Sequence, residues 1–194
     1  MATRPARLGL REPLLARYAA AGWLDGSDLR APAAGLLAEA ARGPDPGGAR
    51  SRLASIIESG PAMAADLLSE PALGRAAVAI AGASRALSEV AAADPAALRT
   101  AAAGEIPSIP ALPADADLPE AGRHLRTSVR RALLAIAVGD LTGRLSMPEV
   151  GRALSDTADG AARAAADTAL RYAGTTTSMA MIAMSFFSWA SLMM

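Results

Sequence analysis

An acidic cluster in the last third of the chain is the first group of residues that could bind a metal ion. Asp156 and Asp159 lie three positions apart in the run Ser155-Asp156-Thr157-Ala158-Asp159, and a helix would place both carboxylates on one face. Carboxylate oxygens suit hard divalent cations. The next position on this face is Arg163, so no third carboxylate completes a set of ligands. We therefore interpret the cluster as a polar, solvent-exposed face and expect no metal-binding residue there.

The single histidine, His124, is a second candidate, because histidine is the side chain most often used as a general base. Arg123 and Arg126 flank it at the start of a predicted long helix. A lone histidine among arginines is more typical of a solvated or interface face than of a catalytic centre. We therefore expect no catalytic role for His124.

Two further segments resemble catalytic motifs only in part. Ser84 follows a glycine but has no nucleophile-elbow sequence around it, and we interpret it as the N-cap of a helix. The segment Gly139-Asp140-Leu141-Thr142-Gly143 has too few glycines and no lysine for a phosphate-binding loop. We predict a turn between two long helices there. The residues alone therefore indicate no catalytic, cofactor-binding or metal-binding site.

The composition excludes several other kinds of site. All 19 basic residues are Arg, and the chain has no Cys, Lys, Asn or Gln. Disulfides, thiolate sites, Schiff bases and a P-loop lysine are therefore excluded. The 19 acidic residues balance the 19 basic ones and are interspersed with them, so nucleic acid is not an expected partner. No signal-peptide pattern opens the chain, and we expect a cytoplasmic protein.

The elements that must position these residues are predicted to be helices throughout. Hydrophobic residues make up 52% of the chain but aromatic residues only 3%, and the abundance of Ala favours closely packed helices. Gly and Pro divide the first half into short pieces, with a loop at Gly43–Gly48, a break at Gly82 and a capped helix start at Asp94-Pro95. No strand is expected in this part. The predicted short helices cover residues 12–21, 33–42, 49–57, 61–68, 73–80, 84–93 and 95–103.

The second half is predicted to hold a proline-rich linker, Gly104–Pro119, and then two long helices. The expected fold is an all-α irregular multi-helix array or bundle, divided into a helical region at 1–103, a linker at 104–117, a long helical pair at 118–173 and an apolar tail at 174–194. The first long helix runs from about Leu118 to Val138 and the second starts at Ser146-Met147-Pro148-Glu149. The inward face of the first long helix is predicted to contain Leu125, Val129, Leu133, Ile136 and Ala137, opposite Arg123, Arg126 and Arg130. The inward face of the second is predicted to contain Val150, Leu154, Ala158, Ala161, Ala162, Ala165, Ala169 and Tyr172.

The tail, Gly174–Met194, has no charged side chain and contains five of the eight methionines. One interpretation is a tail anchor at Ser178–Met194, which would make the chain a small helical membrane protein. Seven Ser and Thr residues, the absence of a flanking positive cluster and the internal position of Trp189 argue against a membrane span. Another interpretation is the first buried strand of an incomplete domain. A non-enzymatic helical interaction module is a third.

Several segments resemble the N-terminal region of the glutamine synthetase adenylyltransferase/adenylyl-removase family, of the actinobacterial type. The quoted runs occur in the family's order from residue 7 to residue 184. They are Arg7-Leu8-Gly9-Leu10 with Tyr18 to Trp23, Gly82-Ala83-Ser84-Arg85-Ala86-Leu87 with Asp94-Pro95-Ala96-Ala97-Leu98, Arg130 to Ala137 with Asp140-Leu141 and Leu154 to Asp159, and Ala180-Met181-Ile182-Ala183-Met184.

The resemblance implies a bifunctional nucleotidyltransferase that adenylylates a tyrosine of glutamine synthetase from ATP and removes AMP by phosphorolysis, in the regulation of nitrogen assimilation. It implies Mg²⁺ and ATP as cofactors, glutamine synthetase as partner and a PII-type signalling protein as a further partner. The family's metal-binding Gly-Ser-Asp-x-Asp motif has no counterpart here, because no Asp or Glu follows Asp167. After Met184 the chain departs from the family, which is typical of a truncated or frame-shifted gene. We therefore expect an N-terminal fragment, inactive alone, that stops at the first strand of the nucleotidyltransferase domain.

Overall fold

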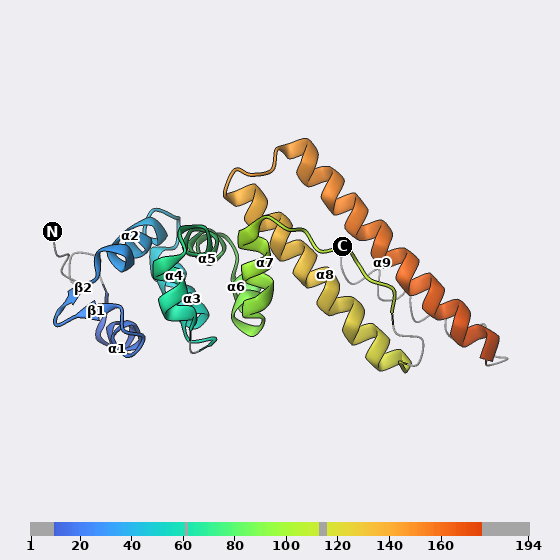
Figure 1. The fold of residues 1–194 in the computed structure, drawn as a ribbon, viewed down its shortest axis with the longest axis horizontal. Coiled ribbons are helices and arrows are strands. Elements are labelled where there is room, and N and C mark those ends of the chain that lie inside the picture. Colours follow the sequence, from blue (N-terminus) through green and yellow to red (C-terminus); the bar gives the residue numbers. More distant parts are fainter. Residues whose placement is uncertain (1–9, 61, 113–115, 176–194) are drawn as a thin grey trace.

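The computed structural model describes residues 10–60, 62–112 and 116–175. Within these ranges the chain is mostly helical, with a single two-stranded sheet, so the predicted all-α array is confirmed. Figure 1 shows the short helices packed in an irregular array and the last two helices as a long pair that extends from it. The elements are α1 (Glu12–Ala20), β1 (Leu24–Asp25), β2 (Asp28–Leu29), α2 (Ala31–Ala40), α3 (Pro46–Ile57), α4 (Met63–Ser69), α5 (Pro71–Ala83), α6 (Arg85–Ala93), α7 (Pro95–Ala103), α8 (Leu118–Leu141) and α9 (Met147–Thr175).

Trp23 organises the N-terminal end of the array. Its indole is fully buried and tilted against the ring of Tyr18, with 5.4 Å between the ring centroids. The indole Nε1–H donates a hydrogen bond of 3.0 Å to the carbonyl of Ala64 in α4. The Tyr18 hydroxyl donates one of 2.7 Å to the carbonyl of Arg50 in α3. These two aromatic residues therefore join α1 to both α3 and α4.

A small antiparallel hairpin follows Trp23, where the sequence predicted no strand. Leu24 lies opposite Leu29 and Asp25 opposite Asp28. Gly26 supplies the positive φ of +59° that the tight turn requires. The strands have only two residues each, which is too short for alternation to appear in the sequence.

Polar caps fix several of the predicted helix starts. Ser84 accepts a hydrogen bond of 3.3 Å from the backbone N–H of Leu87, which confirms its interpretation as the cap of α6. Asp94 accepts one of 3.1 Å from Ala97 N–H at the start of α7. Each cap satisfies one of the free N–H groups that every helix leaves in its first turn.

Two predicted breaks are wrong. Gly43–Gly48 is not all loop, because α3 already begins at Pro46, where Asp45 accepts a hydrogen bond of 2.9 Å from Gly48 N–H. Gly82 lies inside α5, and the break comes at Ser84 instead. A single Gly lowers helix stability by only about 1 kcal/mol relative to Ala. Capping and tertiary packing outweigh that cost at both positions.

The main core surrounds α5, which contacts α2, α3, α4, α6, α7 and α8. Its buried residues come from every helix up to α7 and from the last turns of α8, where Leu134, Ala135 and Val138 join the same cluster. The large apolar side chains that are completely enclosed include Leu37, Leu53, Ile56, Leu73, Ile80 and Leu98. The division of the chain into a helical region, a linker and a long helical pair, with boundaries after residues 103 and 117, stays a prediction.

The long pair packs only partly through the residues predicted, of which Ile136 is buried and Leu125 packs against buried apolar residues. Leu133 on α8 and Leu154 on α9 are 36% and 43% exposed, and Ala158 and Ala162 also face solvent. The residues of α9 that are buried are instead Thr157, Ala164 and Thr168. Small side chains let two helices approach closely, and both threonine hydroxyls donate to the carbonyl four residues earlier, at 2.8 Å each. The sequence pattern followed the larger apolar side chains, so on α9 it included the exposed Leu154 and did not indicate Thr157 or Thr168.

The linker, predicted to have no apolar face, contributes to the packing of this pair. Leu112 and Ala116 are buried, with Ala121 of α8 and Ala164 of α9, in a second and smaller apolar cluster. Ile109 lies against Gly160 of α9. A Cβ atom added at Gly160 would come within 3.1 Å of the Cβ atom of Ile109. The linker residues on both sides of the undescribed positions 113–115 are therefore packed against the helices.

An ion pair between α1 and the end of α3 gives a pH-dependent contribution to stability. Arg17 donates to both carboxylate oxygens of Glu58, at 2.7 Å each, and this hydrogen bonding lowers the pKa of Glu58. A carboxylate with a lowered folded-state pKa stabilises the fold above its unfolded pKa, and the stabilisation is lost as the pH falls through the folded value.

We expect Glu58→Gln to lower the free energy of unfolding by about 0.5 kcal/mol at pH 7, because the side chain is half exposed, and to have little effect near pH 3. Urea unfolding at the two pH values measures the difference. Glu39→Gln is the matched control, since Glu39 is exposed and forms no ion pair with another described residue. An equal loss at both pH values for Glu58→Gln would contradict the interpretation.

Candidate functional site

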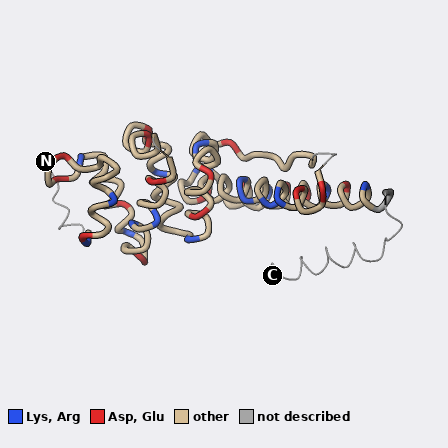
Figure 2. The backbone as a smooth tube through the Cα atoms, turned by 90° about the horizontal axis from the view of Figure 1, so that it is seen from below, with Lys and Arg blue, Asp and Glu red and all other residues tan. Residues whose placement is uncertain are grey.

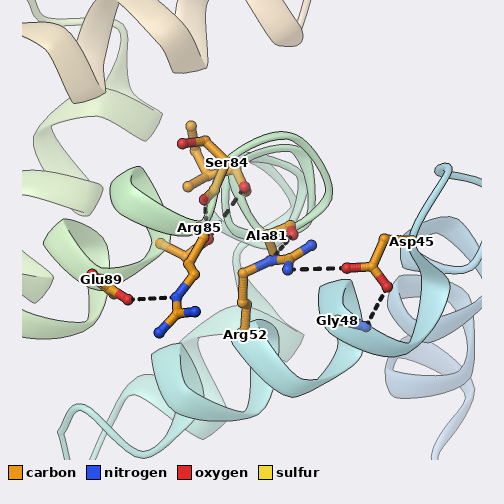
Figure 3. Close-up of polar contacts among 9 residues, drawn as sticks. Asp45, Gly48, Arg52, Ala81, Ser84, Arg85 and Glu89 are labelled. Carbon is orange, nitrogen blue, oxygen red and sulfur yellow. Dashed lines mark hydrogen bonds and ion pairs between the residues drawn. The ribbon is translucent and has the colours of Figure 1, made fainter.

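A polar cleft lies between α3 and α6, with a volume of about 360 Å³. Figure 3 shows Arg52 and Arg85 reaching into it from the two helices. Ser51, Ser55 and Ser88 also line the cleft. Two guanidinium groups among hydroxyls could bind a small anion. They could do so only if the two arginines are not already bound to other groups of the protein.

Both arginines of the cleft already bind groups of the protein (Figure 3). Arg52 donates from Nε to the carbonyl of Ala81 at 2.6 Å and from Nη1 to Asp45 at 3.2 Å. Arg85 donates from Nε to Glu89 at 2.9 Å along its own helix. Arg52 thereby connects the N-terminal cap of α3 with the last turn of α5, where carbonyls lack helical partners. We interpret the cleft as a structural joint between helices.

The exposed face of α8 is the stronger candidate for a binding surface. We call Arg123, His124, Arg126, Arg130 and Arg131 the basic face. All five side chains are exposed, and Figure 2 shows basic residues close together along the long helical pair.

Acidic partners neutralise only part of the basic face. Arg131 donates to Asp94 at 2.6 Å, and His124 lies 3.6 Å from Glu120. The side chains of the remaining three members make no hydrogen bond or ion pair with any described residue.

Two open hollows adjoin the basic face. One, of about 600 Å³, is lined by the basic face with Thr127 and Ser128. The other, of about 380 Å³, lies between α8 and α6 and is lined by Val90, Ala93, Asp94, Thr127, Arg130 and Arg131. The hollows share three residues of α8 and therefore form one continuous surface, with cations on one side and small apolar groups of α6 on the other.

The acidic cluster of α9 does not form a metal site in the described residues. Asp156 and Asp159 are both exposed on the helix. Thr157 lies between them and is buried. Within the described residues, no group of three or more potential metal ligands comes together. The carboxylates of Asp156 and Asp159 are therefore open to solvent.

The turn predicted at Gly139–Gly143 is present in shortened form. Helix α8 continues through Leu141, and Gly143 takes a positive φ of +70° after it. The sequence did not indicate the role of Arg144, which donates to the carbonyls of Ala101 and Ala102 at 2.6 and 3.0 Å. An arginine at the end of a helix complements the negative end of the helix dipole. Arg144 therefore attaches the turn to α7.

The apolar tail lies almost entirely outside the described residues. Helix α9 reaches Thr175, so the proposed anchor at Ser178–Met194 and the proposed strand at Ala180–Met184 both fall beyond the region that the structure describes. Among the helices that are described, none is long and apolar enough to cross a membrane.

Comparisons with known proteins give no match: no family model, no curated protein and no solved structure is similar to the chain at a significant level.

Proposed function

We propose that the chain is a non-catalytic helical binding module, corresponding to the N-terminal part of a glutamine synthetase adenylyltransferase/adenylyl-removase. Its expected partner is glutamine synthetase, with a PII-type signalling protein as a further partner, in the cytoplasm. Mg²⁺ and ATP belong to the nucleotidyltransferase domain of the family, and no described residue of this chain is assigned to bind them.

The observation that supports the proposal is that the described segments on which the family resemblance depends form helices, as the resemblance implies. Ser84 and Asp94 cap the consecutive helices α6 and α7, and these are the segments that resemble the family's pre-catalytic helix pair. Helices α8 and α9 form one long pair that includes two later resembling segments, Arg130–Ala137 and Leu154–Asp159, whereas Ala180–Met184 lies outside the described residues. This support concerns the arrangement of helices, and it is independent of any catalytic residue.

Incubation with adenylylated glutamine synthetase tests the proposal. We expect the purified 194-residue chain to bind the adenylylated enzyme in size-exclusion chromatography and to release no ADP in the presence of phosphate and Mg²⁺. Phosphorolysis would transfer AMP from the tyrosine oxygen to phosphate and leave the free tyrosine, so ADP is the product to measure. Phosphodiesterase treatment of the same substrate is the control that its AMP groups are accessible.

Two results would overturn the proposal separately. ADP release by the purified chain would show that the fragment is catalytic. Absence of binding to both the modified and the unmodified glutamine synthetase would remove the assigned partner.

A further inference from the structure

We propose that the basic face of α8 is a docking surface for an acidic protein segment, in which carboxylates repeat at helical spacing. The inference goes beyond the proposed function, because it concerns one surface and the chemistry of what binds there, and its test contains no glutamine synthetase.

The spacing of the cations suits a helical acidic partner. Arg123, Arg126 and Arg130 follow one another at three and four residues, so they lie along one side of α8 over about 10 Å at 1.5 Å per residue. Carboxylates three or four residues apart on a partner helix repeat at the same interval. Arginine also binds a carboxylate through two parallel hydrogen bonds, which fixes the orientation of the partner as well as attracting it.

The grouping of the arginines is unfavourable for α8 alone. Arg126 has a like charge three residues before it and another four residues after it, and such pairs destabilise a helix by a few tenths of a kcal/mol each. The Arg126 guanidinium lies over Gly122, which has no side chain. Its Nη1 is 3.3 Å from the point that a Cβ atom of residue 122 would occupy. The described fold gains no ion pair from Arg123, Arg126 or Arg130 in return. A ligand with negative charge removes this repulsion.

The surroundings favour an acidic protein segment over nucleic acid. The net charge of the chain is zero, and acidic residues occur throughout the short helices beside α8. A duplex would extend beyond α8 toward these acidic residues, whereas a short segment along α8 would meet Asp94 and Glu120 only where each already lies against a cation of the basic face. The adjoining hollow offers Val90 and Ala93 of α6 beside Arg130. Apolar groups next to cations suit a peptide that carries both carboxylates and aliphatic side chains.

Fluorescence anisotropy with a synthetic helix tests the inference. The probe is a fluorescein-labelled, Ala-based peptide with Glu at alternating spacings of three and four residues, and the matched peptide has Gln at the same positions. At 50 mM salt we expect the full chain to bind the Glu peptide and not the Gln peptide, and the affinity to fall as salt is raised to 200 mM. The double variant R126E/R130E should lose at least about tenfold in affinity.

The matched control is the double variant R42E/R75E, which reverses two exposed arginines on other elements and changes the net charge equally. It should bind the Glu peptide as the parent chain does. In addition, R126Q should raise the midpoint of thermal unfolding by about 1–4 °C while weakening binding, because it removes two like-charge pairs. A purely structural role of Arg126 would lower the midpoint instead.

Three results would overturn the inference. One is binding of the Gln peptide as tightly as the Glu peptide. Another is an equal loss of affinity in R42E/R75E, which would show an effect of net charge alone. The third is displacement of the Glu peptide by a 20-base-pair DNA duplex at lower concentration than by the unlabelled peptide, which would assign the face to nucleic acid.

Discussion

Replacement of Trp23 by alanine is expected to lower the free energy of unfolding by about 3–5 kcal/mol. The indole is fully buried between α1 and α4, so the change leaves a cavity, removes the ring contact with Tyr18 and leaves the carbonyl of Ala64 without its donor. A domain of ordinary stability has only about 5–15 kcal/mol in total. Urea unfolding followed by far-ultraviolet circular dichroism measures the loss without depending on the removed fluorophore.

Two control variants separate the contributions of Trp23. Trp23→Phe keeps most of the apolar contact and loses only the Nε1–H donor, so we expect a loss of about 1–3 kcal/mol. It also keeps the experiment informative if the alanine variant does not fold. Leu170→Ala removes an apolar side chain that is 71% exposed and should change stability by less than about 0.5 kcal/mol. A loss in Trp23→Ala as small as that of Leu170→Ala would contradict the packing described for α1.

Replacement of Gly74 by valine is expected to destabilise the fold by about 2–3 kcal/mol. A Cβ at this position of α5 would lie 2.8 Å from the backbone carbonyl oxygen of Leu67 in α4 and 3.1 Å from Cδ2 of Leu36 in α2. The carbonyl belongs to the backbone and moves only if α4 moves. The close approach of α4 and α5 therefore depends on the missing side chain at Gly74.

Gly82 is the matched control in the same helix, because a Cβ there would meet no atom within 4 Å. Gly82→Ala should stabilise the fold by about 0.5–1 kcal/mol, as glycine is a poor helix former. Gly74→Ala should destabilise it despite the same gain in helix propensity. The opposite signs, measured by denaturant unfolding, are the informative result, and equal signs would refute the close packing of α4 against α5.

Local signals predicted most of the helix boundaries. Asp94-Pro95 places a cap and a proline at the first turn of α7, and Gly104, in the left-handed conformation, ends it. Such signals act over three or four residues, so a single sequence contains all the information they need. The hairpin after Trp23 could not be predicted in the same way, because its stability depends on an indole that contacts α4, 41 residues further along the chain.

The buried faces of the long helices were harder to predict because tertiary packing selects them. Leu154 continues an apolar stripe in the sequence, but the structure buries the side that contains Thr157 and Ala164, where small side chains permit a close approach. No helical periodicity distinguishes a small buried residue from a small exposed one.

The basic face was visible in the sequence only as the polar side of an amphipathic helix. The sequence placed Arg123, Arg126 and Arg130 opposite the apolar positions of α8. It could not show which of the arginines have partners, since the pairing of Arg131 with Asp94 spans 37 residues. Which arginines are paired and which are unpaired depends on how α8 packs on α6 and α7, and only the structure shows this packing.

The two apolar clusters distribute local stability unevenly along the molecule. The larger cluster is buried among the short helices and the last turns of α8. Among the described residues, the smaller has four buried members, from the linker, the start of α8 and α9. Segments with few buried apolar contacts open at free energies below that of global unfolding. Arg123, His124 and Arg126 of the basic face lie near this smaller cluster, whereas Arg131 binds Asp94 beside the larger one. An acidic segment bound along the whole face would contact the helices of both clusters, and we expect it to raise the free energy of local opening of the long pair.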